Sequence, residues 1–225
     1  WRKVIARLDP TRFRCIAPDL LGFGLSSKLM RVRDHTLERH LCAITELVRF
    51  LDLPAGVILV GQDWGGPIVV GAGARALTQK VAGVVLGNTS VLVPSTPKGT
   101  LFHRFSRTPV ISDLAFRLLG FPLGAGMRRA QGDPESMAGE VARAYRWPLA
   151  SALSRSGPLG MARMVPSGLA HPSLPALREL EAWIRAFEGP MALVWGERDP
   201  ILGRALRKHT ATFPNATVTR TQAGH

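Results

Sequence analysis

A short apolar run in this chain leads directly into an aspartate flanked by glycines. Residues 57–60 read Val-Ile-Leu-Val, and residues 61–65 continue as Gly-Gln-Asp-Trp-Gly. The apolar run favours a buried strand and the small residues after it favour a helix, so the segment predicts a sharp strand-to-helix turn with Asp63 at its tip. We expect Gly61 and Gly65 to be required there, because such a turn leaves no room for side chains beside Asp63.

An aspartate at such a turn has two interpretations. It can cap the helix by accepting hydrogen bonds from the first main-chain amides. It can also be a nucleophile, because the beginning of a helix favours an anion. The preceding strand and the two glycines favour Asp63 as the nucleophile.

Strand and helix patterns alternate along most of the chain, which predicts an α/β fold with a parallel sheet covered on both faces. We expect strands at residues 13–17, 56–60, 81–86, 191–195 and 217–219, and helices at residues 36–52, 66–77, 174–187 and 202–212. Residues 90–172 break the alternation and are rich in Pro, Gly and Arg. A structureless loop of that length is implausible in a compact domain. We therefore predict a helical lid at 90–172, inserted into a core formed by residues 1–89 and 173–225.

Two further polar residues follow predicted strands. Asp199 comes after residues 191–195, and His225 comes after residues 217–219. Parallel strands end at the same edge of a sheet, so both side chains are expected to meet Asp63 there. The chain order of nucleophile, acid and base is the order found in α/β-hydrolases.

Motifs at three places along the chain support this interpretation. Residues 18–27 read Pro-Asp-Leu-Leu-Gly-Phe-Gly-Leu-Ser-Ser, residues 62–66 read Gln-Asp-Trp-Gly-Gly, and residues 196–203 read Gly-Glu-Arg-Asp-Pro-Ile-Leu-Gly. Together they resemble the haloalkane dehalogenase branch of the α/β-hydrolases, over nearly the whole chain and most weakly in 90–172. The resemblance implies an α/β-hydrolase fold with a helical lid after strand 6 of the family's sheet.

The same resemblance implies a hydrolase that cleaves the carbon–halogen bond of a small hydrophobic haloalkane and releases alcohol and halide. Asp63 is ionised at neutral pH and would displace the halide to form an alkyl ester. His225, oriented by Asp199, would activate the water that hydrolyses the ester. Some family members carry the acid at the place of Asn88, and the amide there favours Asp199 as the acid.

The resemblance also implies donors for the halide and for the oxyanion. The indole N–H of Trp64 has no acceptor character, which suits a halide, and its main-chain N–H would serve the oxyanion. Trp147 is expected as a second halide ligand, and packing is the alternative for both indoles. The family's remaining donors lie on a His-Gly-x-Pro loop upstream of residue 1. We therefore expect a chain truncated at both ends and poorly active as it stands.

Two other functions remain open. An epoxide hydrolase shares the nucleophile, acid and base but needs two lid tyrosines to protonate the departing oxygen, and this chain has a single tyrosine, Tyr145. A catalytically silent binding protein with the same fold would be expected to have lost part of its triad. Here Asp63, Asp199 and His225 are all chemically competent.

Composition limits the expected partners and location. No apolar run reaches the length of a membrane span. The net charge of +13 comes from scattered Lys and Arg rather than from a basic block, so we expect no nucleic-acid partner. We expect no cofactor and no metal. Cys15 and Cys42 are predicted to be buried, reduced thiols of a cytoplasmic protein, and the oligomeric state is not predicted.

Overall fold

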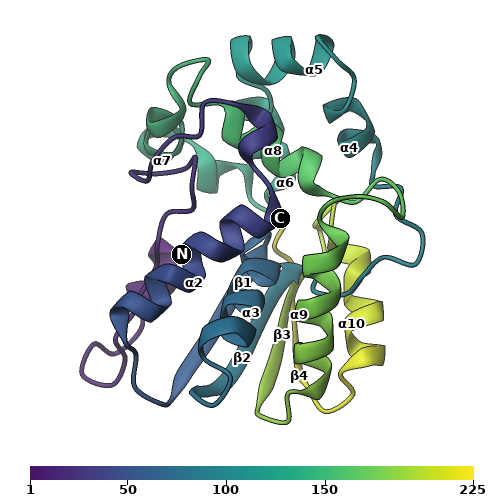
Figure 1. Ribbon diagram of the computed structural model, residues 1–225. Helices are drawn as coiled ribbons and strands as arrows, with labels where there is room; N and C mark the ends of the chain where they lie inside the picture. Colours follow the sequence, from purple (N-terminus) through teal and green to yellow (C-terminus); the bar gives the residue numbers. More distant parts are fainter.

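A parallel sheet forms the centre of the molecule. The computed structural model describes residues 1–225, the side chain of residue 125 excepted. The four strands are arranged in the order β1-β2-β3-β4, and each pairs with the next in parallel. Their bounds are β1 (Val57–Asp63), β2 (Val81–Thr89), β3 (Met191–Gly196) and β4 (Thr217–Thr221). Because all strands run the same way, their carboxyl ends lie at one edge (Figure 1).

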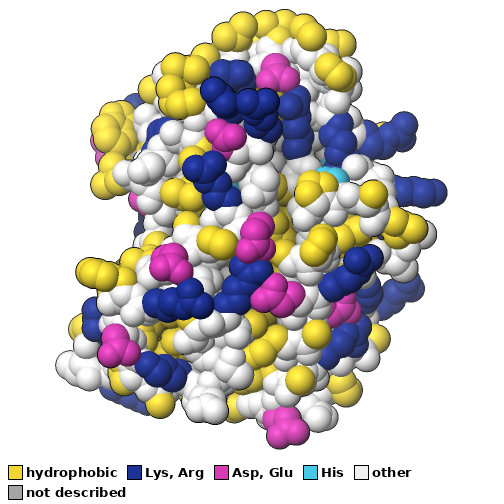
Figure 2. Space-filling view, viewed as in Figure 1, with side chains coloured by type: hydrophobic (Ala, Val, Ile, Leu, Met, Phe, Trp, Pro, Cys, Tyr) yellow, Lys and Arg dark blue, Asp and Glu magenta, His cyan; other side chains and the backbone are white. Residues whose placement is uncertain are grey.

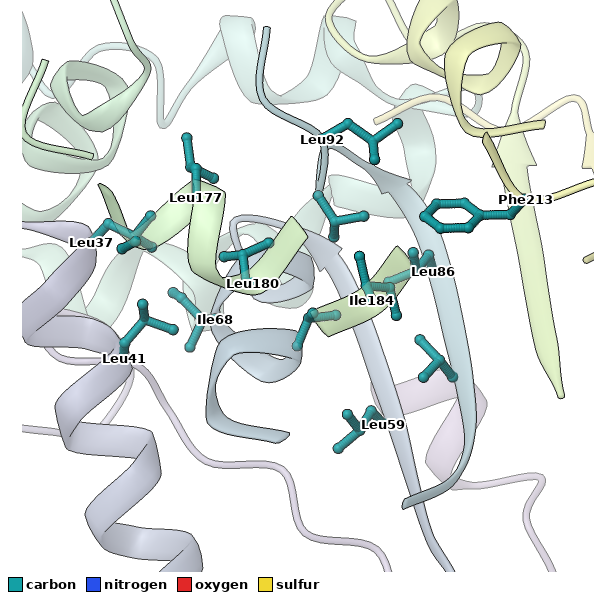
Figure 3. Packing of buried hydrophobic residues seen from close by; sticks show 14 of the residues in the cluster. Leu37, Leu41, Leu59, Ile68, Leu86, Leu92, Leu177, Leu180, Ile184 and Phe213 are labelled. Atoms are coloured by element: carbon teal, nitrogen blue, oxygen red, sulfur yellow. The ribbon is translucent and has the colours of Figure 1, made fainter. Parts of the chain in front are cut away.

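Three helices lie together over one face of this sheet, namely α2 (Leu37–Leu51), α3 (Gly65–Ala76) and α9 (Leu174–Ala186) (Figure 1). Apolar residues at helical spacing give each an apolar stripe, and full burial of one such side chain contributes roughly 1.5–3 kcal/mol. The side chains that meet in this core are shown in Figure 3; they include Leu37 and Leu41 of α2, Ile68 of α3, and Leu177, Leu180 and Ile184 of α9. Farther along the chain, α10 (Leu206–Thr212) and the residue just after it, Phe213, complete the cluster.

Two expectations about the sheet were wrong. Residues 13–17 form no strand, because they pair with no neighbouring strand, and Phe13 and Ile16 are exposed. Strand β1 is buried on one face only. Leu59 is 4% exposed against α3, whereas Ile58 and Val60 on the opposite face are 49% and 45% exposed, since no helix lies against them.

The expectation of buried thiols was also wrong. Cys15 is exposed because its segment joins no sheet. Cys42 points away from the core on α2, where its thiol donates to Oε1 of Glu38 at 3.3 Å. Neither thiol is part of the hydrophobic core.

Residues 90–172 form short helices beyond the carboxyl edge of the sheet (Figure 1), and the described residues of this segment contain no strand. Its elements are α4 (Leu101–Ser106), α5 (Ile111–Asp113), the π-helix η2 (Leu114–Leu118), α6 (Ala125–Ala130), η3 (Pro134–Met137), α7 (Gly139–Arg146), η4 (Trp147–Leu149) and α8 (Ser156–Met164). A second hydrophobic cluster lies inside it, with Phe116 and Leu159 at its centre. The remaining short pieces are α1 (Arg2–Ile5), η1 (Val32–Asp34) and η5 (Gly203–Ala205).

The surface carries its positive charge in scattered positions. On the face shown in Figure 2, Lys and Arg side chains are spread across the molecule with acidic side chains between them, and apolar side chains follow the top edge. Among the described residues, no helix is both long enough and apolar enough to cross a membrane.

Candidate active site

The turn after β1 is closely packed and places Asp63 in a left-handed conformation, with φ of +48°. The Thr89 hydroxyl holds this turn by donating to the carbonyl of Asp63 at 2.6 Å. A Cβ on Gly61 would lie 2.6 Å from the Cα of Gly66, and a Cβ on Gly66 would lie 2.0 Å from the Thr89 hydroxyl. A Cβ on Gly65 would meet nothing within 4 Å. The expected crowding at Gly65 was therefore wrong, and Gly66 is the second glycine that the turn requires.

The structure brings Asp63, Asp199 and His225 together at the carboxyl edge of the sheet. The His225 Nδ1 atom lies 2.8 Å from Oδ2 of Asp199, and its Nε2 atom lies 3.9 Å from Oδ2 of Asp63. An ionised carboxylate can only accept hydrogen bonds, so the proton of the neutral imidazole belongs on Nδ1. The lone pair on Nε2 is then free on the side of Asp63.

Hydrogen bonds hold the fully buried Asp199 side chain in its ionised form. Its Oδ1 accepts from the main-chain amides of Ile201 at 2.7 Å and Leu202 at 2.9 Å. Its Oδ2 accepts from the Asn88 amide at 2.8 Å and from His225. Burial raises the pKa of Asp199, but the hydrogen bonds from His225 and the main chain outweigh it and leave the pKa below its ordinary value.

The pKa values of the other two side chains, Asp63 and His225, are both raised. Desolvation raises the pKa of Asp63, while the charge of His225 and the main-chain amide of Trp64 oppose the rise. Half of the Asp63 side-chain surface nevertheless reaches solvent, which limits this desolvation. Burial lowers the pKa of His225, but the hydrogen bond to Asp199 and the charge of Asp63 outweigh it and leave the pKa raised.

The 90–172 segment contacts this edge of the sheet at two places. The main-chain N–H of His225 donates to the carbonyl of Ala130 at 2.8 Å. The indole N–H of Trp64 donates to the carbonyl of Met161, in α8, at 2.9 Å. A Cβ on Gly224 would lie 2.1 Å from the Ala130 carbonyl oxygen, so the C-terminal residues and the 90–172 segment are in close contact there. The segment therefore lies over the site, as the position of the C-terminus in Figure 1 also shows.

The expected halide ligands are not both at this site. The Trp64 indole is beside Asp63 in sequence, but in this arrangement its N–H is bound by Met161. Trp147 is 68% exposed and lines an open hollow of about 530 Å³ together with Leu119, Arg143 and other residues of the 90–172 segment, none of them in the triad. The structure does not bring Trp147 to Asp63, because η4 lies on the outer surface of the segment.

The single tyrosine is also away from the triad. Tyr145 is 45% exposed, and its ring lies under the Arg2 guanidinium, 5.9 Å from the ring centroid. This position offers no acid to a substrate bound at Asp63. Within the described residues, no three His, Cys, Asp or Glu side chains are grouped as a metal site requires.

Sequence reasoning missed one buried histidine in the 90–172 segment. His103 in α4 is buried, and the charge of His225 contributes to the lowering of its pKa. Its Nδ1 accepts from the main-chain amide of Thr100 at 3.1 Å. A Thr-x-x-His pattern at the start of a helix is the signal that could have identified this pairing, because a capping box joins the same two positions.

Comparisons with known proteins agree with this fold. The family profile described as alpha/beta hydrolase fold matches residues 1–225. The crystal structure of haloalkane dehalogenase DbeA from Bradyrhizobium elkani superposes with a TM-score of 0.79, covering 92% of this chain and 72% of its own, at 22% sequence identity. The architecture is therefore that of an α/β-hydrolase.

Sequence relatives place the chain more narrowly. Haloalkane dehalogenase 1 from Mycobacterium tuberculosis is 30% identical over 230 residues, covering 100% of this chain and 73% of its own length. Haloalkane dehalogenase 2 from the same organism is 33% identical over 223 residues, covering 96% and 72%. The chain belongs to the α/β-hydrolase family and, within it, to the haloalkane dehalogenase-like branch. It is a dehalogenase-like hydrolase, an enzyme.

Proposed function

We propose that this enzyme hydrolyses the carbon–halogen bond of small hydrophobic haloalkanes through an alkyl ester on Asp63, with residues 90–172 acting as a lid. One observation carries the proposal. An aspartate stands at the tip of the turn after β1, and the Nε2 atom of His225 lies 3.9 Å from its Oδ2. A carboxylate nucleophile needs no base, so His225 is free to act in a second step.

The first step is an in-line displacement at a saturated carbon. A carboxylate oxygen of Asp63 forms the new carbon–oxygen bond as the carbon–halogen bond breaks, and the halide leaves with the electron pair. No proton moves. The turn and the beginning of α3 favour negative charge at Asp63 before attack. The hydrogen bond from the Thr89 hydroxyl to the Asp63 carbonyl holds the backbone that carries the side chain.

The second step hydrolyses the ester. His225 takes a proton from water through Nε2, and the oxygen of that water attacks the ester carbonyl, with the main-chain N–H of Trp64 as a donor to the oxyanion. Asp199 stabilises the imidazolium through Nδ1. The alkoxide then leaves with the proton from His225, and the regenerated carboxyl group of Asp63 loses its own proton.

The two steps can be separated by replacing the base. His225→Phe should leave the displacement intact and block hydrolysis, so a short bromoalkane should release about one bromide per site and then stop. Intact-mass analysis should show a stable alkyl adduct, and peptide mapping should place it on the segment that contains Asp63. Asp63→Asn is the matched control and should show neither bromide release nor an adduct.

The same variants test the nearest alternative. An epoxide hydrolase needs an acid at the departing oxygen, and Tyr145 is not near the triad. If an epoxide alkylated the His225→Phe protein while bromoalkanes did not, the dehalogenase proposal would be wrong.

A further inference from the structure

We propose that the outer surface of the 90–172 segment docks on an anionic lipid bilayer. The apolar side chains of α5 and η2 enter the bilayer interface, and basic side chains near both ends of this helical stretch contact the headgroups. The protein lies on the bilayer surface and does not cross it. This inference goes beyond the proposed function and does not depend on the reaction.

The helical stretch formed by α5 and η2 carries apolar side chains on two sides. Its inner side packs into the 90–172 segment through Phe116, which is 1% exposed and belongs to the second hydrophobic cluster. Ile111, Leu114 and Leu118 recur at spacings of three and four residues and therefore lie together on another side. That side and the residues next to it hold five large apolar side chains that are 48–78% exposed, which we call the outer apolar face: Val110, Ile111, Leu114, Leu118 and Leu119.

These five side chains form one stretch rather than standing singly. Single exposed apolar residues are normal on protein surfaces, whereas a contiguous apolar patch marks a contact with a protein or a membrane. Figure 1 places α5 at the top of the molecule, on the side of the 90–172 segment that faces away from the sheet. In the same view, Figure 2 shows apolar side chains along this top edge and Lys and Arg side chains below them. The outer apolar face therefore has cations beside it.

One group of basic residues lies beyond the C-terminal end of the outer apolar face. The open hollow of about 530 Å³ that includes Leu119 and Trp147 is lined by three arginines, Arg143, Arg146 and Arg155. The described residues that line this hollow include no acidic side chain. Trp147 is exposed beside these arginines, and an amphipathic ring in such a place suits the headgroup level of a bilayer.

A second group of basic residues lies before the outer apolar face, around the start of α4. Another open hollow, of about 590 Å³, is lined there by Lys98, Arg104 and Arg107, together with the exposed Leu101. Within the described part of the chain, none of these three basic side chains forms an ion pair with a carboxylate. Their positive charges are therefore not neutralised inside the protein. Anionic headgroups supply the opposite charge.

A bilayer fits this surface better than a second copy of the chain. A two-fold dimer brings the same surface of each copy together, so the residues that flank the outer apolar face would meet each other. Both flanking hollows are basic, and such a contact would place cation against cation. An anionic bilayer instead offers an apolar interior to the five side chains and a negative surface to the basic ones.

Vesicle flotation with the full chain tests the apolar part of the proposal. We expect binding to vesicles of phosphatidylglycerol and phosphatidylcholine, and much weaker binding to vesicles of phosphatidylcholine alone. Leu114→Gln combined with Leu118→Gln should weaken binding to the anionic vesicles by roughly tenfold or more, because two apolar contacts with the bilayer are lost. Phe50→Gln is the matched control, since Phe50 is 85% exposed on α2, away from this surface, and should bind as the parent does.

The basic part has its own pair of variants. Arg104→Gln combined with Arg146→Gln removes one cation from each hollow and should weaken binding to the anionic vesicles by about 25-fold, since each cation near such a surface contributes a factor of about five. Arg204→Gln combined with Arg207→Gln removes two exposed cations from η5 and α10 and should change the affinity little. Equal losses in the two double variants would show that only the net charge matters, and the proposed surface would be wrong.

A third measurement does not depend on the folding of the leucine variant. Lipids brominated on their acyl chains should quench part of the tryptophan fluorescence of the bound parent, and Trp147→Phe should remove that part. Quenching that is unchanged in Trp147→Phe would place a different surface on the bilayer.

Two further outcomes would overturn the proposal. The first is a parent that binds neither kind of vesicle. The second is a parent that is dimeric without lipid and becomes monomeric in the Leu114→Gln, Leu118→Gln variant while vesicle binding is unchanged, which would make the outer apolar face a contact between copies. All of these measurements are made without substrate, so they decide the docking proposal whether or not the alkyl adduct forms on Asp63.

Discussion

The side-chain amide of Asn88 donates to Oδ2 of Asp199 at 2.8 Å, and this is the carboxylate oxygen that also binds His225. The same amide pairs with both main-chain groups of Gly196, donating to its carbonyl at 3.0 Å and accepting from its N–H at 2.7 Å. Asn88 therefore continues the contact between β2 and β3 beyond the last paired residues of those strands. It fixes the acid relative to the sheet, and through the acid it fixes the imidazole.

Replacing Asn88 should affect the two chemical steps differently. We expect Asn88→Ala to slow ester hydrolysis by about 10- to 100-fold, which corresponds to losing a hydrogen bond to a charged group. Bromide release in the first turnover should keep its rate, because Asp63 attacks without a base. Rapid-quench kinetics measures both rates, and an equal loss in both would show that Asn88 supports the fold rather than the acid.

The pH dependence of hydrolysis should differ from the titration of the free enzyme. The charge of Asp63 is one of the causes that raise the pKa of His225, and esterification removes that charge. His225 must be unprotonated to activate water, so the hydrolysis rate falls as the pH drops below its pKa. We expect this acid limb to lie at lower pH than the His225 pKa of the free enzyme. Single-turnover hydrolysis of the adduct at several pH values measures the midpoint of the acid limb, and an NMR titration measures the His225 pKa of the free enzyme. An acid limb at or above the free-enzyme pKa would contradict this account.

Alanine substitutions at the two neighbouring glycines should have unequal effects. Gly66→Ala drives a Cβ to 2.0 Å from the Thr89 hydroxyl and should cost about 1–3 kcal/mol of unfolding free energy. Gly65→Ala meets nothing within 4 Å and should stay within about 1 kcal/mol of the parent, or gain stability from the better helix former. Urea unfolding of the parent and of both variants measures these free energies. Equal destabilisation by both substitutions would show that the turn is packed differently.

Acid should destabilise the folded protein through a buried histidine pair. The rings of His35 and His40 stack with centroids 5.4 Å apart, and burial followed by the charges of His35 and Arg39 lowers the pKa of His40 from 6.5 to about 4. As the pH falls from 6.5 to about 4, the unfolded chain takes up a proton at His40 that the folded protein does not. Stability should fall across that window, by up to about 3 kcal/mol from this group, and remain flat above it.

Unfolding measured at several pH values tests the histidine pair. His40→Gln should flatten the fall, and His171→Gln, at a partly exposed histidine, should flatten it less. If His40→Gln kept the full acid sensitivity of the parent, groups other than His40 would control it.

The sequence carries local information on the triad, since Asp63 ends one apolar strand, Asp199 lies shortly after another, and His225 lies shortly after the last strand of the sheet. The position of a residue after a strand fixes the sheet edge at which it lies. The direction of the Trp64 indole could not be predicted in this way, because its acceptor is a carbonyl in α8 whose position depends on how the whole 90–172 segment packs. The strand predicted at residues 13–17 does not form, for a similar reason. A strand needs a neighbouring strand to pair with, and the local sequence pattern does not show whether one is present.

The hydrogen bond from the His225 amide to the Ala130 carbonyl joins the proposed general base to the segment that covers it. Displacing that segment at Ala130 would draw the imidazole away from Asp63 at the same time. Under the proposed mechanism, opening this segment to admit a substrate would therefore stop hydrolysis of the ester. An enzyme opened in the middle of its cycle would keep its alkyl group bound, and the intermediate would wait, protected from water activation, until the cover closed again.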